Sequence, residues 1–127
     1  MKILVTGGAG YIGAHVVHAA QAAGHECVVV DNLSTGIKER IEAEIVELDI
    51  AAPDAGEKLT KLLSSQKFDS VIHLAARKQV GESVEIPERY FLDNIGGMAN
   101  LLLAMRETNH DSLVFSSSAA TYGMPDA

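Results

Sequence analysis

The chain has 127 residues, 47% of them hydrophobic, which is enough for one domain with a buried core. A formal net charge of −7 without any cluster of Lys or Arg argues against a nucleic-acid-binding surface. The single cysteine, Cys27, permits no internal disulfide, and no apolar stretch is long enough to cross a membrane. Because the N-terminus runs directly into a predicted strand, we expect no signal peptide and a soluble, cytoplasmic protein.

The first thirteen residues predict a strand, a glycine-rich turn and the start of a helix. The apolar run Ile3–Val5 is typical of a buried parallel strand, and it is followed by Gly7, Gly8, Gly10 and Gly13. In this context the spacing Gly-x-Gly-x-x-Gly indicates a dinucleotide-binding turn. Glycines permit the tight turn, a close approach of the backbone to a pyrophosphate and close packing of helix on strand, while the helix N-terminus faces the phosphates. The alternative is a glycine-rich turn that binds no ligand.

A helix and a second strand follow the turn. The helix is predicted from Tyr11 to Ala23, and Gly24 is placed to end it. The apolar residues at helical spacing predict a buried face made of Ile12, Val16, Ala19, Ala20 and Ala23. The strand Cys27–Val30 comes next, and we expect its cysteine to be a small buried apolar residue.

Asp31 lies at the carboxyl end of this second strand, about 20 residues beyond the glycines. A carboxylate at that place can accept hydrogen bonds from the ribose hydroxyls of an adenosine, and it repels a 2′-phosphate. No arginine lies beside it, so the sequence favours NAD over NADP. The alternative is a solvated loop aspartate that caps the next turn.

Strands and helices alternate along the rest of the chain. Further strands are predicted over 43–48, 70–75 and 113–116, with a short helix from near Pro53 and a long one from Pro87 to about Asn109. Five strands with helices between them imply an α/β fold, a Rossmann-type doubly wound parallel sheet of strand order 3-2-1-4-5. Ligands bind such sheets beyond the carboxyl ends of the strands, which here hold residues 7–13, 31–32, 49–50, 75–78 and 116–118.

Gly96 and Gly97 interrupt the predicted long helix. Each glycine costs a helix interior roughly 1 kcal/mol relative to alanine. A close approach of this helix to the sheet or to the cofactor would explain them, and the alternative is a locally weak or kinked helix. Farther along, Leu101, Leu102 and Met105 are predicted to belong to the core or in part to a subunit interface.

Other kinds of chemistry are not indicated. The five histidines are scattered, and only His15 and His18 share a short spacing, without a third ligand nearby, so no metal site is predicted. Ser118 lacks the glycine pattern of a nucleophile elbow, which argues against a hydrolase triad.

Several segments carry a family resemblance. In chain order they are Thr6–Gly13, Asp31–Leu33, Asp49–Ile50, Val80–Ser83, Asp93–Asn94 and Phe115–Gly123. Together they resemble the amino-terminal part of the UDP-glucose 4-epimerases, a group within the extended short-chain dehydrogenase/reductase family. The glycine motif is shared with the wider family. The segment Val-Gly-Glu-Ser, preceded by Lys78, and the triple serine followed by Thr-Tyr-Gly are more specific to the epimerases.

The resemblance implies roles for individual residues. The implied NAD site consists of Gly7, Gly10, Tyr11, Ile12 and Gly13 around the glycine turn, Asp31 and Asn32 at the adenosine ribose, Asp49 and Ile50 beside the adenine, Leu74, Ala75, Ala76, Lys78 and Asn94 toward the nicotinamide, and Ser116 as a further cofactor contact. Ser118 matches the catalytic serine that hydrogen-bonds the 4-oxygen of the sugar.

The implied reaction is the NAD-dependent interconversion of UDP-glucose and UDP-galactose through a 4-keto intermediate. The family's tyrosine base has a lysine four residues later, a pair that this chain lacks, because Tyr11, Tyr90 and Tyr122 precede His15, Asn94 and Asp126. We therefore expect residues 1–127 to form an incomplete NAD-binding domain, without the substrate domain and inactive alone, of a longer, homodimeric epimerase of galactose metabolism. The alternatives are another nucleotide-sugar epimerase or dehydratase of the family, and a non-catalytic NAD-binding module.

Overall fold

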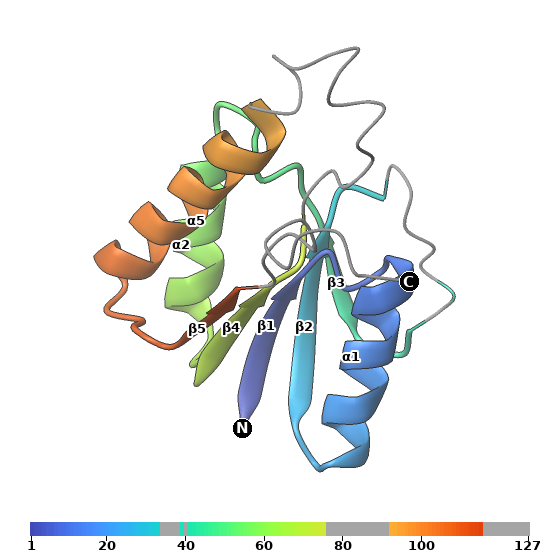
Figure 1. Cartoon of the computed structure of the whole chain (residues 1–127). Coiled ribbons are helices and arrows are strands. Elements are labelled where there is room, and N and C mark those ends of the chain that lie inside the picture. The colour runs from blue at the N-terminus through green and yellow to red at the C-terminus, as the bar shows by residue number, and fades with distance from the viewer. Residues whose placement is uncertain (34–38, 40, 76–91, 116–127) are drawn as a thin grey trace, which may run out of the picture.

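The computed structural model describes residues 1–33, 39, 41–75 and 92–115 (Figure 1). Their strands form one five-stranded sheet in the order β3-β2-β1-β4-β5, and each neighbouring pair runs parallel. The strands are β1 (Lys2–Thr6), β2 (Glu26–Asp31), β3 (Glu44–Glu47), β4 (Ser70–His73) and β5 (Leu113–Phe115). The predicted α/β fold and strand order are confirmed.

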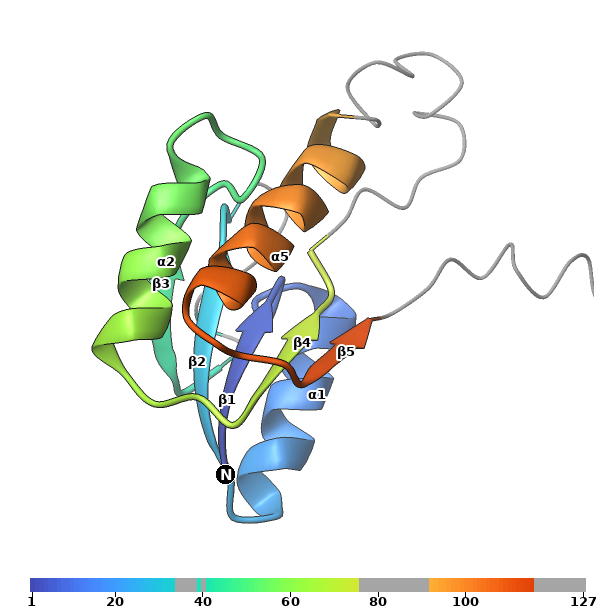
Figure 2. The same cartoon turned by 90° about the vertical axis from the view of Figure 1, so that its left-hand side faces the viewer.

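Helices cover both faces of the sheet. Helix α1 (Tyr11–Ala22) packs on one face, and α2 (Ala55–Ser65) and α5 (Gly97–Glu107) lie side by side on the other (Figures 1 and 2). This three-layer arrangement explains why the central strands β1 and β2 read as continuous apolar runs, because both of their faces are buried, whereas the edge strands β3 and β5 are half-buried or exposed. Along β2, Val28 and Val30 join the core under α2 and α5, whereas Cys27 and Val29 join the core under α1.

The buried face of α1 differs from the predicted one. Ile12, Ala19 and Ala23 are exposed, and the residues buried on the sheet are Gly13, Ala14 and Val17. Of the predicted residues, Ala20 does pack against this core. The prediction followed the hydrophobic residues at helical spacing and passed over Gly13. The helix instead turns its smallest residues to the sheet at its N-terminal end, because the first turn of α1 lies directly against the glycine turn.

The end of α1 agrees with the prediction. Gly24 has a φ of +89°, in the left-handed region that favours glycine. Its N–H donates to the carbonyl of Gln21 at 3.0 Å, and the N–H of His25 donates to the carbonyl of Ala20 at 3.0 Å. This pair of bonds is a Schellman motif, which satisfies the last carbonyls of the helix and turns the chain into β2.

The described part of the predicted long helix begins as a π-helical turn, η2 (Leu92–Gly96), and continues as α5. The two glycines at the junction have different explanations. A Cβ on Gly97 would lie 2.9 Å from Cγ1 of Ile50, so a close approach to the β3–α2 connection requires a glycine there. A Cβ on Gly96 would meet nothing within 4 Å, and this glycine ends the irregular turn instead. A close approach of the helix therefore explains Gly97, with the β3–α2 connection as the neighbour, and a local irregularity of the helix accounts for Gly96.

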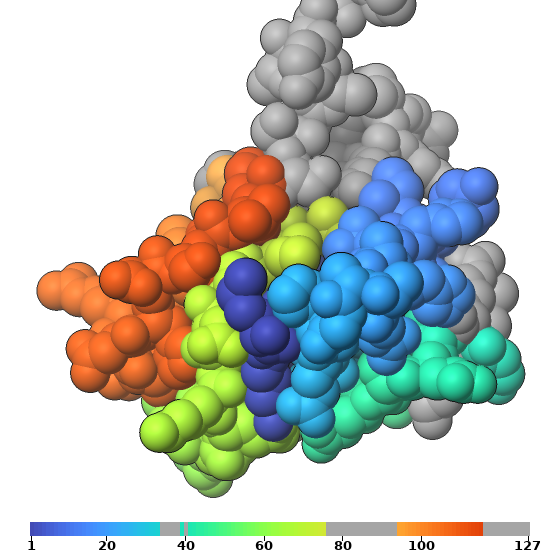
Figure 3. Space-filling model, turned by 90° about the horizontal axis from the view of Figure 1, so that it is seen from below, coloured from blue at the N-terminus to red at the C-terminus, as the bar shows by residue number. Residues whose placement is uncertain are grey.

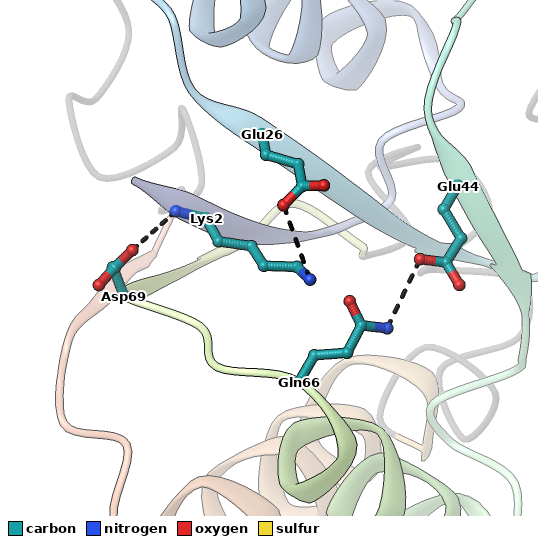
Figure 4. Close-up of polar contacts among 5 residues, drawn as sticks. All are labelled: Lys2, Glu26, Glu44, Gln66 and Asp69. Carbon is teal, nitrogen blue, oxygen red and sulfur yellow. Dashed lines mark hydrogen bonds and ion pairs between the residues drawn. The ribbon is translucent and has the colours of Figure 1, made fainter.

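Side chains at the amino-terminal edge of the sheet tie neighbouring elements together (Figure 4). Figure 3 shows the molecule from below, with β1 between β2 and β4. Lys2 donates its N–H to Asp69 at 2.7 Å, and its ammonium group lies 3.6 Å from the carboxylate of Glu26. Beside them, the amide of Gln66 lies 3.5 Å from the carboxylate of Glu44. These contacts join β1, β2 and β3 to the chain between α2 and β4, and they give this edge a structural role.

Candidate functional site

The candidate site lies at the carboxyl edge of the sheet, where the strand order reverses. The chain leaves β1 through α1 to β2 and β3 on one side, and returns to the other side of β1 with β4 and β5. The two connections therefore diverge at the ends of β1 and β4. Crevices at such a switch point are the usual ligand sites of open parallel sheets.

The glycine turn passes across this switch point. Gly7 has a φ of +76°, and a Cβ on it would lie 2.8 Å from the backbone nitrogen of Ala75 beyond β4. Its own N–H donates to the carbonyl of Val30 in β2 at 2.7 Å. A Cβ on Gly13 would collide with the carbonyl oxygen of Gly7 and lie 2.7 Å from Cα of Gly8. The turn thus fits only glycines at these two positions, and the expected close packing of α1 is confirmed.

The N-terminus of α1 presents backbone N–H groups at the same place. Ala14 donates to the carbonyl of Gly10 at 2.8 Å, which is the first bond within the helix. Gly10 is the N-cap and provides no capping side chain, and no acidic residue lies in the first turn. The N–H groups of the first turn, together with the positive end of the helix dipole, are suited to bind an anion such as a phosphate.

Asp31 connects the end of β2 to the glycine turn. Its side chain is buried, one carboxylate oxygen accepts the N–H of Ala9 at 3.0 Å, and the other accepts the N–H of Leu33 at 2.8 Å. The alternative of a solvated loop aspartate is therefore wrong, although the bond to Leu33 does order the following turn. A carboxylate has about four acceptor positions, so both oxygens retain capacity for ligand hydroxyls.

A buried hydroxyl–imidazole pair supports the opposite side of the switch point. Oγ1 of Thr6, at the end of β1, lies 2.6 Å from Nδ1 of His73, at the end of β4. The same oxygen accepts the N–H groups of Leu74 and Ala75 at 3.1 and 3.3 Å. Burial lowers the pKa of His73, because the charged imidazolium would lose its hydration. The sequence alone does not indicate this pair, because Thr6 and His73 lie 67 positions apart and each belongs to a predicted strand region.

Helix α5 holds the connection between β3 and α2 in place. The amide of Asn100 donates to the carbonyl of Ile50 at 2.7 Å, in addition to the contact of Gly97 with the Ile50 side chain. Asp49 is exposed, and its carboxylate accepts the N–H of Ala51 at 3.0 Å in a local turn. Ile50 itself is buried. This connection therefore has a fixed position at the carboxyl edge, next to the end of β2.

The structure describes only some of the predicted site residues. It brings to the carboxyl edge the glycine turn with Tyr11 and Ile12, both exposed, together with Asp31, Asn32, Asp49, Ile50, Leu74 and Ala75. Asn94 lies half-buried in η2. Four predicted residues lie outside the described residues, namely Ala76, Lys78, Ser116 and Ser118.

The described residues indicate neither a metal site nor a membrane-spanning helix. No group of three or more His, Cys, Asp or Glu side chains in them is arranged to hold a metal ion. None of the helices described is both long and apolar enough to span a membrane.

Comparison with known proteins identifies the family. The sequence profile of the NAD dependent epimerase/dehydratase family matches residues 3–127. The chain belongs to this family. Among curated members, it is 44% identical over 128 residues to the UDP-glucose 4-epimerase of Corynebacterium glutamicum, covering 99% of this chain and 37% of that protein. It is 47% identical over 127 residues to the UDP-glucose 4-epimerase of Streptomyces lividans, covering 98% and 38%.

Solved structures of family members share the fold. A crystal structure of UDP-glucose 4-epimerase from Brucella ovis in complex with NAD superposes with a TM-score of 0.90 at 42% identity, over 99% of this chain and 38% of that one. The UDP-glucose-4-epimerase of Stenotrophomonas maltophila, with bound NAD and formylated UDP-arabinopyranose, gives a TM-score of 0.91 at 40% identity, over 100% and 40%. The chain thus spans somewhat under half the length of the relatives that it matches.

Proposed function

We propose that this chain binds NAD at the carboxyl edge of its sheet and forms the cofactor-binding part of a UDP-glucose 4-epimerase. The observation that carries the proposal is the buried carboxylate of Asp31 beside a glycine turn and a helix N-terminus at the switch point. The likeness to epimerases whose crystals contain NAD supports the same assignment. The 127 residues constitute an incomplete Rossmann domain, and the substrate domain belongs to the longer protein.

Different residues are assigned to the pyrophosphate, the adenosine ribose, the adenine and the nicotinamide of NAD. The pyrophosphate would lie over Gly10, where the absence of a side chain lets a ligand approach the backbone of the turn. The N–H groups of Tyr11 and Ile12 would bind it, as expected for a helix N-terminus. Asp31 and Asn32 would bind the adenosine ribose. The remaining assigned contacts are Asp49 and Ile50 at the adenine, Leu74, Ala75, Ala76, Lys78 and Asn94 toward the nicotinamide, and Ser116 and Gly13 as further cofactor contacts.

The reaction proposed for the longer protein is the interconversion of UDP-glucose and UDP-galactose through a 4-keto sugar. Bound NAD would supply reversible hydride transfer at C4 of the sugar. The protein would supply positioning and proton transfer. Within this chain, the hydroxyl of Ser118 would hydrogen-bond the 4-oxygen of the sugar. The base that takes the proton of the 4-hydroxyl would come from the tyrosine–lysine pair of the longer protein.

A test of the cofactor is the difference between NAD and NADP, measured by calorimetric titration. The carboxylate of Asp31 repels a 2′-phosphate, so NAD should bind and NADP should bind much more weakly. Asp31→Ala should weaken NAD by about 1.5–3 kcal/mol, as expected for lost hydrogen bonds to a charged group, and should reduce the preference over NADP. Equal affinities of the unsubstituted chain for the two cofactors would contradict the proposal.

Asp69→Ala is a matched control for this substitution. Asp69 also uses its carboxylate to accept a backbone N–H, that of Lys2 at 2.7 Å, but it lies at the amino-terminal edge of the sheet. Its removal should cost stability without altering either cofactor affinity. If both variants lose NAD to the same degree, the effect reports loss of folding, and the assignment of Asp31 is wrong.

The sugar and the catalytic serine are tested in the longer protein. Ser118→Ala should lower kcat for UDP-galactose conversion while the affinity for NAD changes little, since the serine acts on the reacting oxygen. Unchanged turnover would remove Ser118 from the mechanism. Rapid turnover of a different nucleotide sugar with none of UDP-galactose would replace the substrate while leaving the NAD site intact.

We also propose that the longer protein is a cytoplasmic homodimer of galactose metabolism. Leu102 and Leu103 of α5 are 47% and 53% exposed although their neighbours Leu101 and Ala104 are fully buried. An exposed pair of leucines on a helix that already covers the sheet supports an association through α5. Substituting both leucines with glutamate should convert the longer protein to a monomer in sedimentation analysis.

A further inference from the structure

We propose that Thr6 and His73 form a proton-controlled positioning pair for the cofactor crevice. In this proposal the Thr6 hydroxyl holds the backbone of Leu74 and Ala75 against the glycine turn only while the imidazole of His73 is neutral. Cofactor affinity should therefore fall on mild acidification. The inference rests on the proposed function, because NAD is the ligand whose binding reports the position of this backbone.

The first step is the burial of the pair. Thr6 is 0% and His73 is 2% exposed, and Oγ1 of Thr6 lies 2.6 Å from Nδ1 of His73. On β5, the ring of Phe115 lies against the imidazole at 5.8 Å between centroids and 18° between planes. A hydrogen bond this short between buried groups has no competing solvent, so its donor and acceptor must be complementary.

The second step fixes the tautomer of the histidine. The Thr6 oxygen accepts the N–H of Ala75 at 3.3 Å and shares that of Leu74 at 3.1 Å with the Thr6 carbonyl at 2.9 Å. A hydroxyl has two acceptor positions and one proton. Because both acceptor positions face N–H groups, its proton must point to Nδ1 of His73. The neutral imidazole therefore accepts at Nδ1 and carries its hydrogen on Nε2.

The third step is the effect of a proton. An imidazolium would place an N–H at Nδ1 against a hydroxyl that already receives two N–H groups. The hydroxyl would have to turn a lone pair to the imidazolium, so it could no longer accept both N–H groups. Its own proton would then face one of them, either Leu74, which keeps the Thr6 carbonyl as an acceptor, or Ala75. Among the described residues, the imidazole contacts the Thr6 hydroxyl from β1 and the Phe115 ring from β5, and neither of these two groups is charged. Burial is accordingly the cause of the lowered pKa of His73.

The fourth step connects the pair to the crevice. A Cβ on Gly7 would lie 2.9 Å from the carbonyl carbon of Leu74 and 2.8 Å from the nitrogen of Ala75, so these backbones are in direct contact across the switch point. Leu74 and Ala75 also continue β4 toward the place assigned to the nicotinamide. Loss of one of the two bonds to the Thr6 hydroxyl would loosen that side of the crevice, which the glycine turn contacts through Gly7.

The test combines NAD titration with three variants between about pH 8 and pH 5.5. The unsubstituted chain should keep its NAD affinity down to about pH 6.5 and lose it as the pH falls further, because burial lowers the pKa of His73. His73→Asn places an amide oxygen near the position of Nδ1, so it should bind NAD at pH 8 and show no such loss. Thr6→Val should bind about tenfold more weakly at every pH, as expected for lost backbone hydrogen bonds. Thr6→Ser, which retains the hydroxyl, should restore both the affinity and its pH dependence.

A second measurement needs neither a variant nor NAD. Nitrogen NMR of His73 in the unsubstituted chain should show an unprotonated Nδ1 at neutral pH, and the amide of Leu74 or Ala75 should exchange faster as His73 becomes protonated. A protonated Nδ1, or exchange that is constant for both amides through the titration, would overturn the pair. So would an acid loss of NAD affinity that is equal in His73→Asn. Failure of the unsubstituted chain to bind NAD at pH 8 would refute the proposed function, and the exchange of these two amides would then decide the pair by itself.

Discussion

Gly13 gives a sensitive test of how α1 is placed over the glycine turn. In Gly13→Ala the new Cβ would collide with the Gly7 oxygen and lie 2.7 Å from Cα of Gly8. These atoms are backbone and cannot rotate aside, so α1 must move away from β1. Overpacking of this kind costs about 1–3 kcal/mol, and alanine recovers roughly 1 kcal/mol of helix propensity. We expect a net loss of up to about 2 kcal/mol in the free energy of unfolding.

Gly96→Ala is the matched control. Gly96 has helical angles, a φ of −61° and a ψ of −44°, and a Cβ on it would meet nothing within 4 Å. This variant should be unchanged or more stable, by up to about 1 kcal/mol. Urea denaturation followed by circular dichroism measures both, and the slopes should agree if the exposed area is the same. A Gly13→Ala variant as stable as Gly96→Ala would refute the close packing of α1 on the turn.

Three other outcomes follow from the packing of single side chains. Cys27 is 4% exposed and burial raises the pKa of its thiol, so a thiol reagent should react with it slowly in native buffer and quickly in urea; rapid native labelling would contradict the buried strand. Asn100→Asp places a carboxylate against the carbonyls of Ile50 and Ala52, and should lower the free energy of unfolding by about 2–3 kcal/mol, whereas an unchanged urea midpoint would exclude this anchor. Burial lowers the pKa of His73 in the folded chain. The contribution of the neutral imidazole to the free energy of unfolding should therefore be complete above about pH 6.5 and be lost as the pH falls through the pKa of the folded state. His73→Asn should remove this pH dependence.

The sequence predicted the strands and their order because the central strands are largely buried and read as apolar runs. Cys27–Val30 is uninterrupted, the run after Ser70 is apolar except for His73, and helices alternate with the strands, so few parallel topologies remain. The glycine spacing also predicted the turn and the close packing at Gly13. These features depend on local patterns, which a single sequence displays directly.

The sequence did not predict features that depend on contacts between distant segments. The buried face of α1 was misplaced by one residue because bulky Ile12 outranked Gly13 in hydrophobicity, although the helix touches the turn through the glycine. The different roles of Gly96 and Gly97 depend on Ile50, which follows β3. The Thr6–His73 pair forms only because β1 and β4 are neighbours, and no spacing in the sequence marks it.

The most direct test of the central claim is the location of bound NAD on the chain. Amide chemical shifts of the 127-residue chain should be recorded during titration with NAD. The account predicts the largest changes in Gly7–Gly13 and Asp31–Leu33, with further changes at Leu74 and Ala75, all at the carboxyl edge of the sheet. Changes concentrated at the opposite edge, around Glu26 and Glu44, or saturation by NADP at the same concentration as NAD, would contradict it.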